Sequence, residues 1–396
     1  MKKEKNLKYK GIKVFLLDVS GRQAVPIAKG FAELGCEVTA YGHSKLNPGY
    51  LTKYTTHNIL FDRDNPDNEN FYEYAAHKIR DNKYDIVIPL RDKAAIYLSK
   101  NKRELEQYAH IAVNYWEIMQ YASDKALTME ACEELGIPAP RTVSGDNILE
   151  QVDAKGLQFP LVVKPRTAGG SVGFSIIKSR ESLEAYVNSY DNRNGPILCQ
   201  EYIEQGDAPQ YRADFFRDRD GNFKAAIVGK NTRWYPLDGG FGIFAVTLHD
   251  DEIIKNGKKL LDRIGWNGYA NIDMVWDSRE NKAKIIEING RTGATILLDY
   301  VADINMSQLI LENEMGYPVT DMLDYKDNCR TSCFFIDILW FLKSKNRFKA
   351  DPSWFDRRGA KDAIFQWSDP KPGFGYLIQG LQNIKKGNAR RKRFEP

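Results

Sequence analysis

The chain has 396 residues, of which 42% are hydrophobic and 28% are charged, so two or three domains with ordinary cores are expected at roughly 150 residues per domain. This composition excludes a small disulfide-stapled module and a disordered chain, and no apolar run reaches the roughly 18 residues that a membrane-spanning helix needs. The net charge of +4 is uneven, because the segment from Lys343 to the end holds fourteen Lys or Arg and five acidic residues. A mildly acidic body with a basic tail argues against a nucleic-acid-binding domain.

The cysteines are five in number and scattered through the chain. They are Cys36, Cys132, Cys199, Cys329 and Cys333. Only the last two lie close together, and no second pair is available to complete a zinc site with them. The start of the chain is basic but has no apolar stretch followed by small residues, so we expect no secretory signal. Reduced thiols and a cytoplasmic location are therefore predicted.

Strand and helix signals alternate through residues 1–114, which predicts a doubly wound parallel sheet. Buried strands are expected at residues 13–19, 36–42 and 84–90, with an amphipathic helix at 24–35. The fold class expected for this first domain is therefore α/β.

Two positions at the ends of these strands bear on ligand binding. The first turn reads DVSGRQA, with Gly21 alone where a dinucleotide fingerprint has three glycines, so NAD binding is disfavoured. Arg91 follows the strand at 84–90, at the edge where parallel sheets usually bind ligands, and is a candidate for substrate binding.

A complete helix is predicted after residue 122. Ser123 and Asp124 are candidate N-caps, the amphipathic pattern runs through Leu135, and Gly136 ends it with Pro138 beyond.

The segment at residues 159–179 predicts a hairpin around a glycine loop. Lys164 ends its first apolar strand, where a lysine is costly to bury without an anionic partner such as phosphate. The loop can surround phosphate oxygens with consecutive N–H groups, and its serine adds a hydroxyl donor. The loop residues concerned are Gly169, Gly170, Ser171 and Gly173. A purely structural glycine hairpin is the alternative, and a P-loop is excluded because its lysine would follow the glycines.

An extended segment follows at residues 197–207, with the sequence ILCQEYIEQGD. It turns polar at Gln200 and Glu201 and continues with Tyr202 and Ile203. Such a segment can present N–H and C=O groups to the edge of a base, as a sheet edge does to a strand. By itself the string has almost no specificity.

The strongest chemical signal is a predicted hairpin of the strands YANIDMVWD and KAKIIEINGR. Glu287 and Asn289 share one face of their strand, and antiparallel pairing can place Asp273 opposite them. Two carboxylates and an amide suit Mg²⁺, which prefers oxygen ligands and is usually shared with substrate phosphates. Arg291 projects from the same face. A solvated face with salt bridges is the alternative, which the apolar setting IIEIN disfavours.

Between these motifs lies a glycine-rich segment at residues 229–248. Arg233 is a candidate to hold a carboxylate in a bidentate fork, and Gly239 and Gly240 would let a substrate approach the backbone. A glycine-rich turn beside a surface arginine is the alternative.

Together, the strings SDKALTMEACEELGIPAP, FPLVVKPRTAGGSVGFSII, CQEYIE and IDMVWD…IIEINGR resemble the ATP-grasp superfamily in order and spacing, over residues from about 115 to 310. The resemblance implies a two-subdomain α+β ATP-grasp fold after a Rossmann-like domain, with ATP between the subdomains. Many relatives also have an acidic ribose contact after the adenine segment, and here both Glu204 and Asp207 are candidates, with Asp207 taken as the ATP-binding residue.

Residue roles follow from the same resemblance. It implies Lys125 and Lys164 near the phosphates, the loop from Gly169 to Gly173 as a lid, and Gln200 to Ile203 at the adenine. It places Asp273, Glu287 and Asn289 on Mg²⁺. Arg291 would steady the reacting phosphoryl group and, with Lys164, is expected to be catalytic.

The activity implied is that of a carboxylate–amine ligase using ATP and Mg²⁺. A carboxylate would attack the γ-phosphate of ATP, and an amine would then displace phosphate to give an amide, with an amino acid as the first choice for one small-molecule substrate. Two alternatives stay open: bicarbonate activation as in biotin carboxylases, and a non-catalytic ATP-binding module. Carbamoyl phosphate synthase large chains are excluded because they hold two such units in a much longer chain.

Three parts are therefore expected: residues 1–114, an ATP-grasp domain at 115–342 with its lid subdomain near 155–205, and a basic, aromatic-rich extension at 343–396. In the extension, apolar residues at helical spacing precede a cluster of cations, which predicts peripheral contact with an anionic membrane. The apolar residues are Tyr376, Leu377, Leu381 and Ile384. Packing on the enzyme body with a solvated tail is the alternative. No nucleic-acid partner is expected, and a homodimer stays open.

Overall fold

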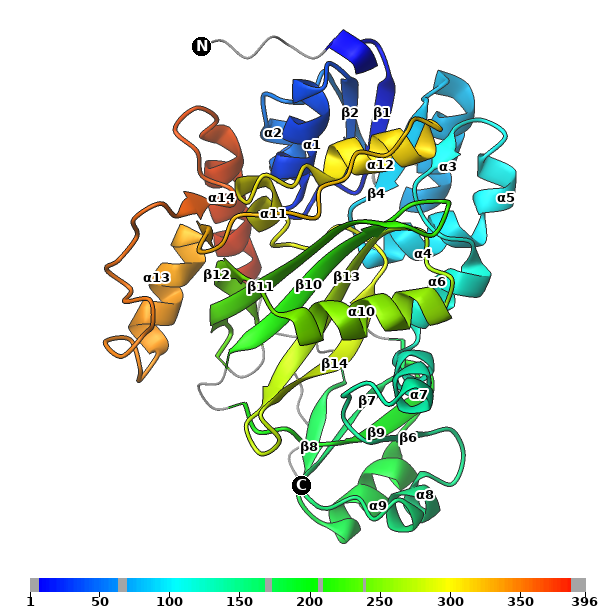
Figure 1. Ribbon diagram of the computed structural model, residues 1–396, viewed down its shortest axis with the longest axis vertical. Coiled ribbons are helices and arrows are strands. Elements are labelled where there is room, and N and C mark those ends of the chain that lie inside the picture. Colours follow the sequence, from blue (N-terminus) through cyan, green and yellow to red (C-terminus); the bar gives the residue numbers. More distant parts are fainter. Residues whose placement is uncertain (1–6, 63–69, 168–172, 206–208, 238–239, 386–396) are drawn as a thin grey trace.

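The computed structural model describes residues 7–62, 70–167, 173–205, 209–237 and 240–385. Three β-sheets follow one another along the long axis of the molecule (Figure 1). The N-terminal sheet lies at one end, the largest sheet in the middle and the smallest at the other end. The predicted metal-binding residues lie on the middle sheet, and Lys164 and Gln200, predicted to bind ATP, lie on the small one.

The N-terminal sheet has five strands in the order β3-β2-β1-β4-β5, and every pairing is parallel. This confirms the predicted doubly wound arrangement, since successive strands are joined through helices. The strands are β1 Lys13–Leu17, β2 Glu37–Gly42, β3 His57–Leu60, β4 Ile86–Pro89 and β5 His110–Ile111. The helices are α1 Ala24–Glu33, α2 Pro48–Leu51, α3 Phe71–Asn82, α4 Asp92–Lys100 and α5 Lys102–Leu105, after a short 3₁₀ turn, Leu7–Tyr9.

Two helices connect this sheet to the small one: α6 Trp116–Ser123 and α7 Lys125–Leu135. The Asp124 side chain caps α7 by accepting a hydrogen bond from the Ala126 N–H, and Gly136 ends the helix at φ 62°. Both predicted boundaries of α7 are confirmed. The left-handed conformation at its end is one that glycine adopts without a steric penalty.

The small sheet has four antiparallel strands in the order β6-β9-β7-β8. The predicted hairpin is confirmed, because Leu161 pairs with Ile177 and Val163 with Ser175. The strands are β6 Thr142–Ser144, β7 Leu161–Pro165, β8 Ser175–Ile177 and β9 Ile197–Glu201, with helices α8 Ile148–Ala154 and α9 Arg180–Ser189. Its first strand begins at Thr142, so the sheet includes residues before the expected lid boundary near 155.

The large sheet has seven strands in the order β14-β13-β10-β11-β12-β15-β16. Its strands are β10 Gln210–Arg217, β11 Phe223–Tyr235, β12 Phe241–Leu248, β13 Gly268–Asp277, β14 Lys282–Asn289, β15 Arg330–Ser332 and β16 Lys361–Asp362. The helices along this part of the chain are α10 Asp251–Arg263, α11 Leu297–Val301, α12 Met306–Glu314, α13 Phe334–Lys343 and α14 Lys371–Lys385. The predicted pair of strands around DSRENK is thus the β13–β14 hairpin.

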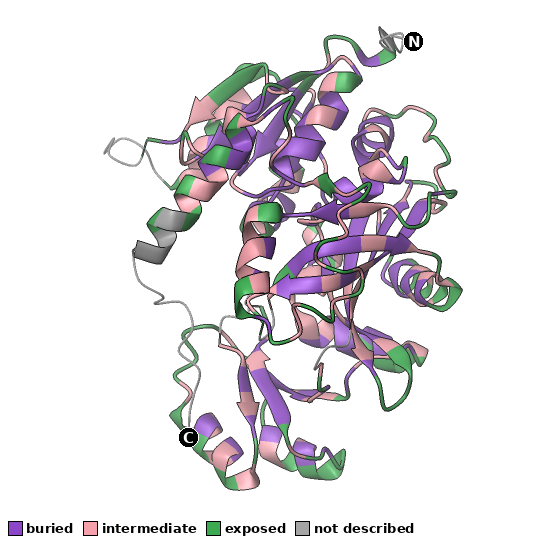
Figure 2. Cartoon of the chain, turned by 90° about the vertical axis from the view of Figure 1, so that its left-hand side faces the viewer, coloured by how far each residue is buried: buried purple, intermediate pink, exposed green. Residues whose placement is uncertain are grey.

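Both faces of the large sheet are covered. On one face α10 packs with Leu260 and Leu261 against a core that includes Phe215 of β10. On the other face α12 lies between the sheet and the N-terminal domain and shares a core with Phe216 and Leu16 (Figure 1). Strand residues facing these cores are buried, and exposed residues gather on the outer helices and loops (Figure 2). Alternate residues of β10 therefore enter two different cores, as the two-residue period of a strand requires.

The segment after the ATP-grasp motifs folds onto the body up to Lys385. β15 and β16 extend the large sheet, and Trp340, Ala363 and Ile364 share a small core with Ile243. α14 packs on α2, where a side chain at Gly375 would collide with Leu51.

The predicted terminal helix is thus present, but its expected lipid-facing residues Tyr376 and Leu377 are half-buried. Phe374 and Ile378 are its exposed apolar residues instead. The side chains of Leu381 and Ile384 lie outside the described part.

Arg233 anchors this C-terminal region. Its guanidinium donates to both carboxylate oxygens of Asp337 on α13, at 2.8 and 3.0 Å, and to the Pro352 carbonyl. Both side chains are completely buried. We expected Arg233 to bind a substrate carboxylate in a bidentate fork. In the structure, the Asp337 carboxylate already occupies that fork.

Replacing Arg233 should destabilise the fold. Arg233→Met leaves the buried carboxylate of Asp337 with only the half-exposed Arg357 as its cationic partner, so we expect the free energy of unfolding to fall by about 3–5 kcal/mol. Urea denaturation followed by circular dichroism measures the loss. The double variant Arg233→Met/Asp337→Leu should recover much of it, and an unchanged stability of the single variant would contradict the role of the pair.

Candidate active site

The β13–β14 hairpin places the three predicted metal-binding side chains together. Asp273 pairs directly with Glu287 across the two strands, and Asn271 pairs with Asn289 two residues along. Burial, reinforced by the negative charge of Glu287, raises the pKa of Asp273 to about 6. Two crowded carboxylates next to an amide form a set of oxygen donors that fits a hard divalent cation.

The amide of Asn289 is held in one orientation. Its Nδ2 donates to Asp273 Oδ2 and to Asn271 Oδ1, both at 2.9 Å. The Asn271 amide in turn donates to buried Asp214 at 2.8 Å, and Asp214 also accepts from the Tyr269 hydroxyl. With both Nδ2 hydrogens used, the carbonyl oxygen of Asn289 is the end of the amide that remains to face a cation.

Two lysines approach this oxygen cluster from the side of the small sheet. Lys125, the first residue of α7, lies 3.3 Å from Glu287 Oε2. Lys164 lies on β7, and burial together with the positive charge of Lys125 lowers its pKa to about 8, while Glu287 opposes this change. Two cations, from α7 and β7, thus converge on a carboxylate of β14.

A second ion pair fixes the spacing of the two lysines. Arg166, two residues beyond Lys164, binds the Asp124 carboxylate with three hydrogen bonds of 2.6 to 3.1 Å. The Lys125 N–H also donates to the Arg166 carbonyl at 3.1 Å. The start of α7 and the end of β7 are therefore tied to each other next to the oxygen cluster.

Arg291 links the hairpin to the N-terminal domain. Its Nε lies 2.8 Å from Asp92 Oδ1, at the start of α4. The charges of Arg291 and Arg91 outweigh the effect of burial and lower the pKa of Asp92. Arg91 is exposed and is the residue immediately before α4. The carboxyl edge of the N-terminal sheet, where Arg91 was predicted to contact a ligand, therefore adjoins Arg291.

The predicted adenine segment begins at the end of β9. Gln200 is buried and donates to Thr142 at 2.8 Å, and Ile203 is also buried. Tyr202 is half-buried and Glu204 is exposed. Of the two ribose candidates, Asp207 lies outside the described residues.

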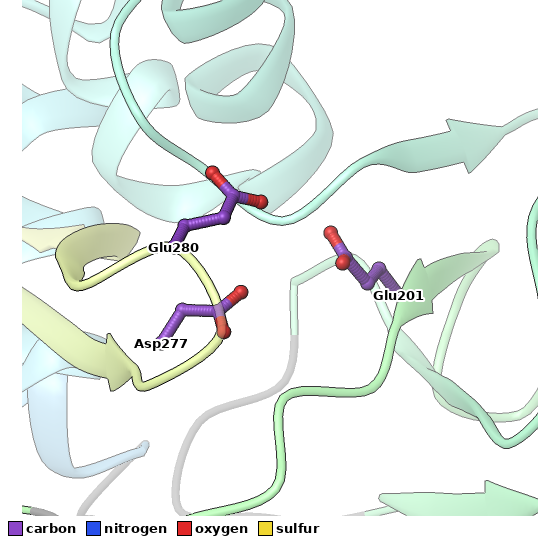
Figure 3. A group of neighbouring side chains, drawn as sticks. All are labelled: Glu201, Asp277 and Glu280. Carbon is purple, nitrogen blue, oxygen red and sulfur yellow. The ribbon is translucent and has the colours of Figure 1, made fainter.

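Glu201 takes part in a network at the tip of the β13–β14 hairpin. Its carboxylate points toward those of Asp277 and Glu280 (Figure 3). Lys284 Nζ lies 3.5, 2.9 and 2.6 Å from Glu201, Asp277 and Glu280, and Arg279 binds Glu201 at 2.6 Å. Because cations already neutralise these three acids, we interpret the cluster as a salt-bridge network that ties β9 to the hairpin.

Some predicted site residues cannot be placed. Gly169, Gly170, Ser171, Asp207 and Gly239 lie outside the described residues. Gly173 is described and has φ 69°, and a side chain there would approach Pro165 within 2.8 Å. Gly240 donates to the Pro236 carbonyl in a tight turn where a side chain would overlap Tyr235.

The sequence reasoning missed the supporting residues Asp214, Tyr269, Asn271 and Asp92. Asn271 had a detectable signal, because it lies two residues before Asp273 on the same face of one strand. Asp214 lies on β10 and Asp92 on α4, far along the sequence from the residues that they contact. No local pattern therefore predicted these contacts.

Comparisons with known proteins agree on one fold. A family model described as "ATP-grasp domain" matches residues 122–295. D-aspartate ligase of Enterococcus faecium is 24% identical over 312 residues, covering 73% of each chain. D-alanine–D-alanine ligase of Pseudomonas entomophila is 24% identical over 187 residues, which are 44% of this chain and 56% of that protein.

Solved structures give the same result at lower identity. The biotin carboxylase domain of Hydrogenobacter thermophilus 2-oxoglutarate carboxylase, in complex with MgADP, has a TM-score of 0.64 at 16% identity, covering 81% of this chain and 73% of that one. N5-carboxyaminoimidazole synthetase of Staphylococcus aureus with ADP has a TM-score of 0.61 at 15% identity, with 81% of both chains covered.

Both relatives are named as ligases, and both solved structures contain ADP, one of them as the magnesium salt. Residues 122–295 therefore match an ATP-grasp domain, and the parallel, Rossmann-like sheet of the N-terminal domain precedes them. In the part of the chain that the structure describes, no helix is both long and apolar enough to cross a membrane. The cysteines are all free thiols, as their scattered positions predicted.

The pKa of Lys164 can be measured directly. NMR of ¹³Cε-labelled lysine should show one signal that titrates near pH 8, more than two units below an ordinary lysine at about 10.4. Lys164→Arg should remove this signal and so assign it. Glu287→Gln should move the midpoint still lower, because the carboxylate that favours the charged amine is lost. A midpoint near 10 would contradict the described burial of Lys164.

Proposed function

We propose that this enzyme phosphorylates a small carboxylate with ATP and joins the product to an amine, giving an amide, ADP and phosphate. The observation that carries this proposal is the convergence of Asp273, Glu287 and Asn289 with the cations Lys125, Lys164 and Arg291 at one place between the sheets. Such a site neutralises the charge that accumulates when two anions are brought together.

The residues divide the work by their chemistry. Asp273, Glu287 and Asn289 hold Mg²⁺, which when bound screens the charge of the ATP phosphates. Lys125 and Lys164 contact phosphate oxygens, and phosphate would replace Glu287 as the partner that Lys125 has in the structure. Arg291 steadies the phosphoryl group during transfer, and its contact with Asp92 sets its position beside the N-terminal domain.

The remaining ATP contacts are proposed for the lid and the adenine segment. The loop from Gly169 to Gly173, with Ser171, would cover the phosphates and exclude water from the reactive acyl phosphate. Gln200 to Ile203 would receive the adenine, and Asp207 the ribose. The division into residues 1–114, 115–342 and 343–396 stays a prediction of the same kind.

The chemistry explains why ATP is consumed. A carboxylate is a poor acyl donor because oxide is a poor leaving group, and transfer of the γ-phosphoryl group to it supplies phosphate as a better one. The amine nitrogen then attacks the carbonyl carbon, the C–O bond to phosphate breaks, and the amine loses a proton. An amino acid is the substrate we favour, because two relatives are named D-aspartate ligase and D-alanine–D-alanine ligase. The match to the first of them covers 73% of each chain.

Bicarbonate activation is the second candidate. It is supported by the structural similarity to biotin carboxylase, but that similarity is at 16% identity and concerns the fold. The two candidate substrates are distinguished by measuring whether the rate of ADP formation rises with the concentration of bicarbonate or with that of an amino acid. A non-catalytic ATP-binding module is disfavoured, because a binding protein has no need for the paired carboxylates.

Glu287→Gln tests the proposal at its centre. The change removes one negative charge from the metal set with almost no change of shape, so turnover should fall at least 100-fold while circular dichroism stays unchanged. ADP formation is measured with a panel of amino acids and amines across a range of Mg²⁺ concentrations. Wild-type rates in the variant at low Mg²⁺ would refute the metal assignment.

Besides small-molecule carboxylates and amines, we propose two further kinds of partner: a second copy of this chain and an anionic membrane. Assembly as a homodimer stays a prediction. Peripheral contact with an anionic membrane is proposed for the exposed Phe374 and Ile378 of α14 together with the basic residues near the end of the chain. Those cations include Arg390, Arg391, Lys392 and Arg393.

Vesicle sedimentation tests the membrane contact. Each cation near an anionic leaflet contributes about 1 kcal/mol, and screening acts within roughly 8 Å at physiological salt. Binding to phosphatidylglycerol vesicles should therefore fade as salt rises and be lost when residues 386–396 are deleted. Full-length protein that stays in the supernatant at low salt would end this proposal.

A further inference from the structure

Arg22 lies at the carboxyl edge of the N-terminal sheet, between β1 and α1. Its side chain is buried, with 4% of the residue exposed. The guanidinium donates to the Gly242 carbonyl and lies 5.0 Å from the centre of the Phe241 ring. Its Nε has no hydrogen-bond partner among the described residues. A buried cation without a paired anion is unfavourable unless function requires it.

The other fully buried arginines differ from Arg22 in one respect. Arg212 binds the carboxylates of Asp214 and Asp299, and Arg233 binds that of Asp337. Across the part of the chain that the structure describes, no carboxylate forms an ion pair with Arg22. The fold therefore neutralises its structural arginines with carboxylates, whereas the side-chain neighbour recorded for Arg22 is the thiol of Cys333, a group whose pKa burial raises.

The position of Arg22 connects it to the proposed reaction. It lines a cavity of about 10 Å³ with Ala294 and Thr295, which follow Arg291 in the chain. The adjacent Gln23 donates to the Leu90 carbonyl, directly before Arg91 and Asp92. Since Asp92 binds Arg291, the first turn of α1 adjoins the same edge of the N-terminal sheet as the reacting site.

Groups that favour an anion surround this position. Arg91 supplies an exposed second cation at the end of β4. Tyr376 of α14 is close to both arginines: burial raises the pKa of its phenol, the nearby Cys333 thiol adds to the rise, and the charges of Arg22 and Arg91 oppose it. The first turn of α1 contains no acidic residue, and its N-cap makes no side-chain hydrogen bond.

We propose that Arg22 binds a carboxylate of the substrate that is not phosphorylated, and so selects substrates that carry a second anionic group. This inference rests on the proposed ligase function. The free Nε edge of the guanidinium offers a donor to a carboxylate oxygen, while Gly242 occupies the Nη2 end.

Access to Arg22 requires a small movement. The cavity beside it has room for about one water molecule, which is too little for a carboxylate with its attached carbon chain. The ring of Phe241 covers the guanidinium but is itself 45% exposed. We expect the incoming substrate to displace this ring and to take its place over the cation.

Arg22→Met and Arg22→Lys in the full-length enzyme test the proposal. ADP formation is measured with aspartate, glutamate and alanine of both configurations and with succinate. For each dicarboxylic acid that supports turnover, Arg22→Met should raise KM at least tenfold, while KM for ATP, and for alanine where it is a substrate, stays unchanged. Arg22→Lys, which keeps the charge but not the fork, should give a smaller increase.

Stability separates a binding role from a structural one. Without ligand, Arg22→Met should unfold at a temperature no lower than the wild type, because an unpaired buried charge is removed. Arg217→Met is the matched control: Arg217 also donates to a backbone carbonyl and lies over an aromatic ring, but it pairs with Asp262. Its removal should leave every KM unchanged.

The outcomes distinguish this inference from the proposed function. An unchanged KM in Arg22→Met, or a lower unfolding temperature in both Arg22 variants with unchanged KM, would overturn the role of Arg22. If the wild type forms no ADP with any carboxylic acid or with bicarbonate, the ligase proposal fails. In that case the same acids are tested by thermal shift: a stabilisation lost in Arg22→Met supports the anion site, and its absence or retention overturns it.

Discussion

Two carboxylates held against each other across the β13–β14 hairpin set the main constraint in this protein. Asp273 and Glu287 are paired in register and both are partly buried, so their charges repel each other at short range. The fold answers this repulsion by bringing in cations from separate elements, including Lys125 from α7 and Arg291 from the segment after β14. At the candidate active site, bound ligands would take part in this balance of charges.

The supporting structure keeps that balance in a fixed geometry. Arg166 ties β7 to the cap of α7, and the chain of hydrogen bonds from Asp214 through Asn271 sets the orientation of the Asn289 amide. A third network around Lys284 ties the adenine strand to the tip of the same hairpin. The first network fixes the elements that carry the lysines, the second fixes the oxygen cluster within the large sheet, and the third connects the small sheet to the large one.

Buried arginines show how charge is used elsewhere in the fold. Arg233 and Arg212 are paired with acids that belong to the chain, and such pairs hold α13 and α11 to the large sheet. Arg22 has the same burial without an acid. The difference separates arginines that stabilise the fold from one that is available to a substrate, a distinction that residue type and spacing in the sequence do not carry.

The sequence by itself determined the elements and the chemistry that depend on local order. The parallel sheet, the boundaries of α7, the β7–β8 hairpin and the register of Asp273 with Glu287 all follow from periodicity, capping and turns, which act over short distances along the chain. The tertiary structure decided which cations are committed to acids. Arg22 and Arg233 both lie near glycines in the sequence. Of these two, Arg233 contacts a carboxylate, which comes from a helix about one hundred residues later. Ion pairs of this kind depend on which elements pack together, and no local pattern records that.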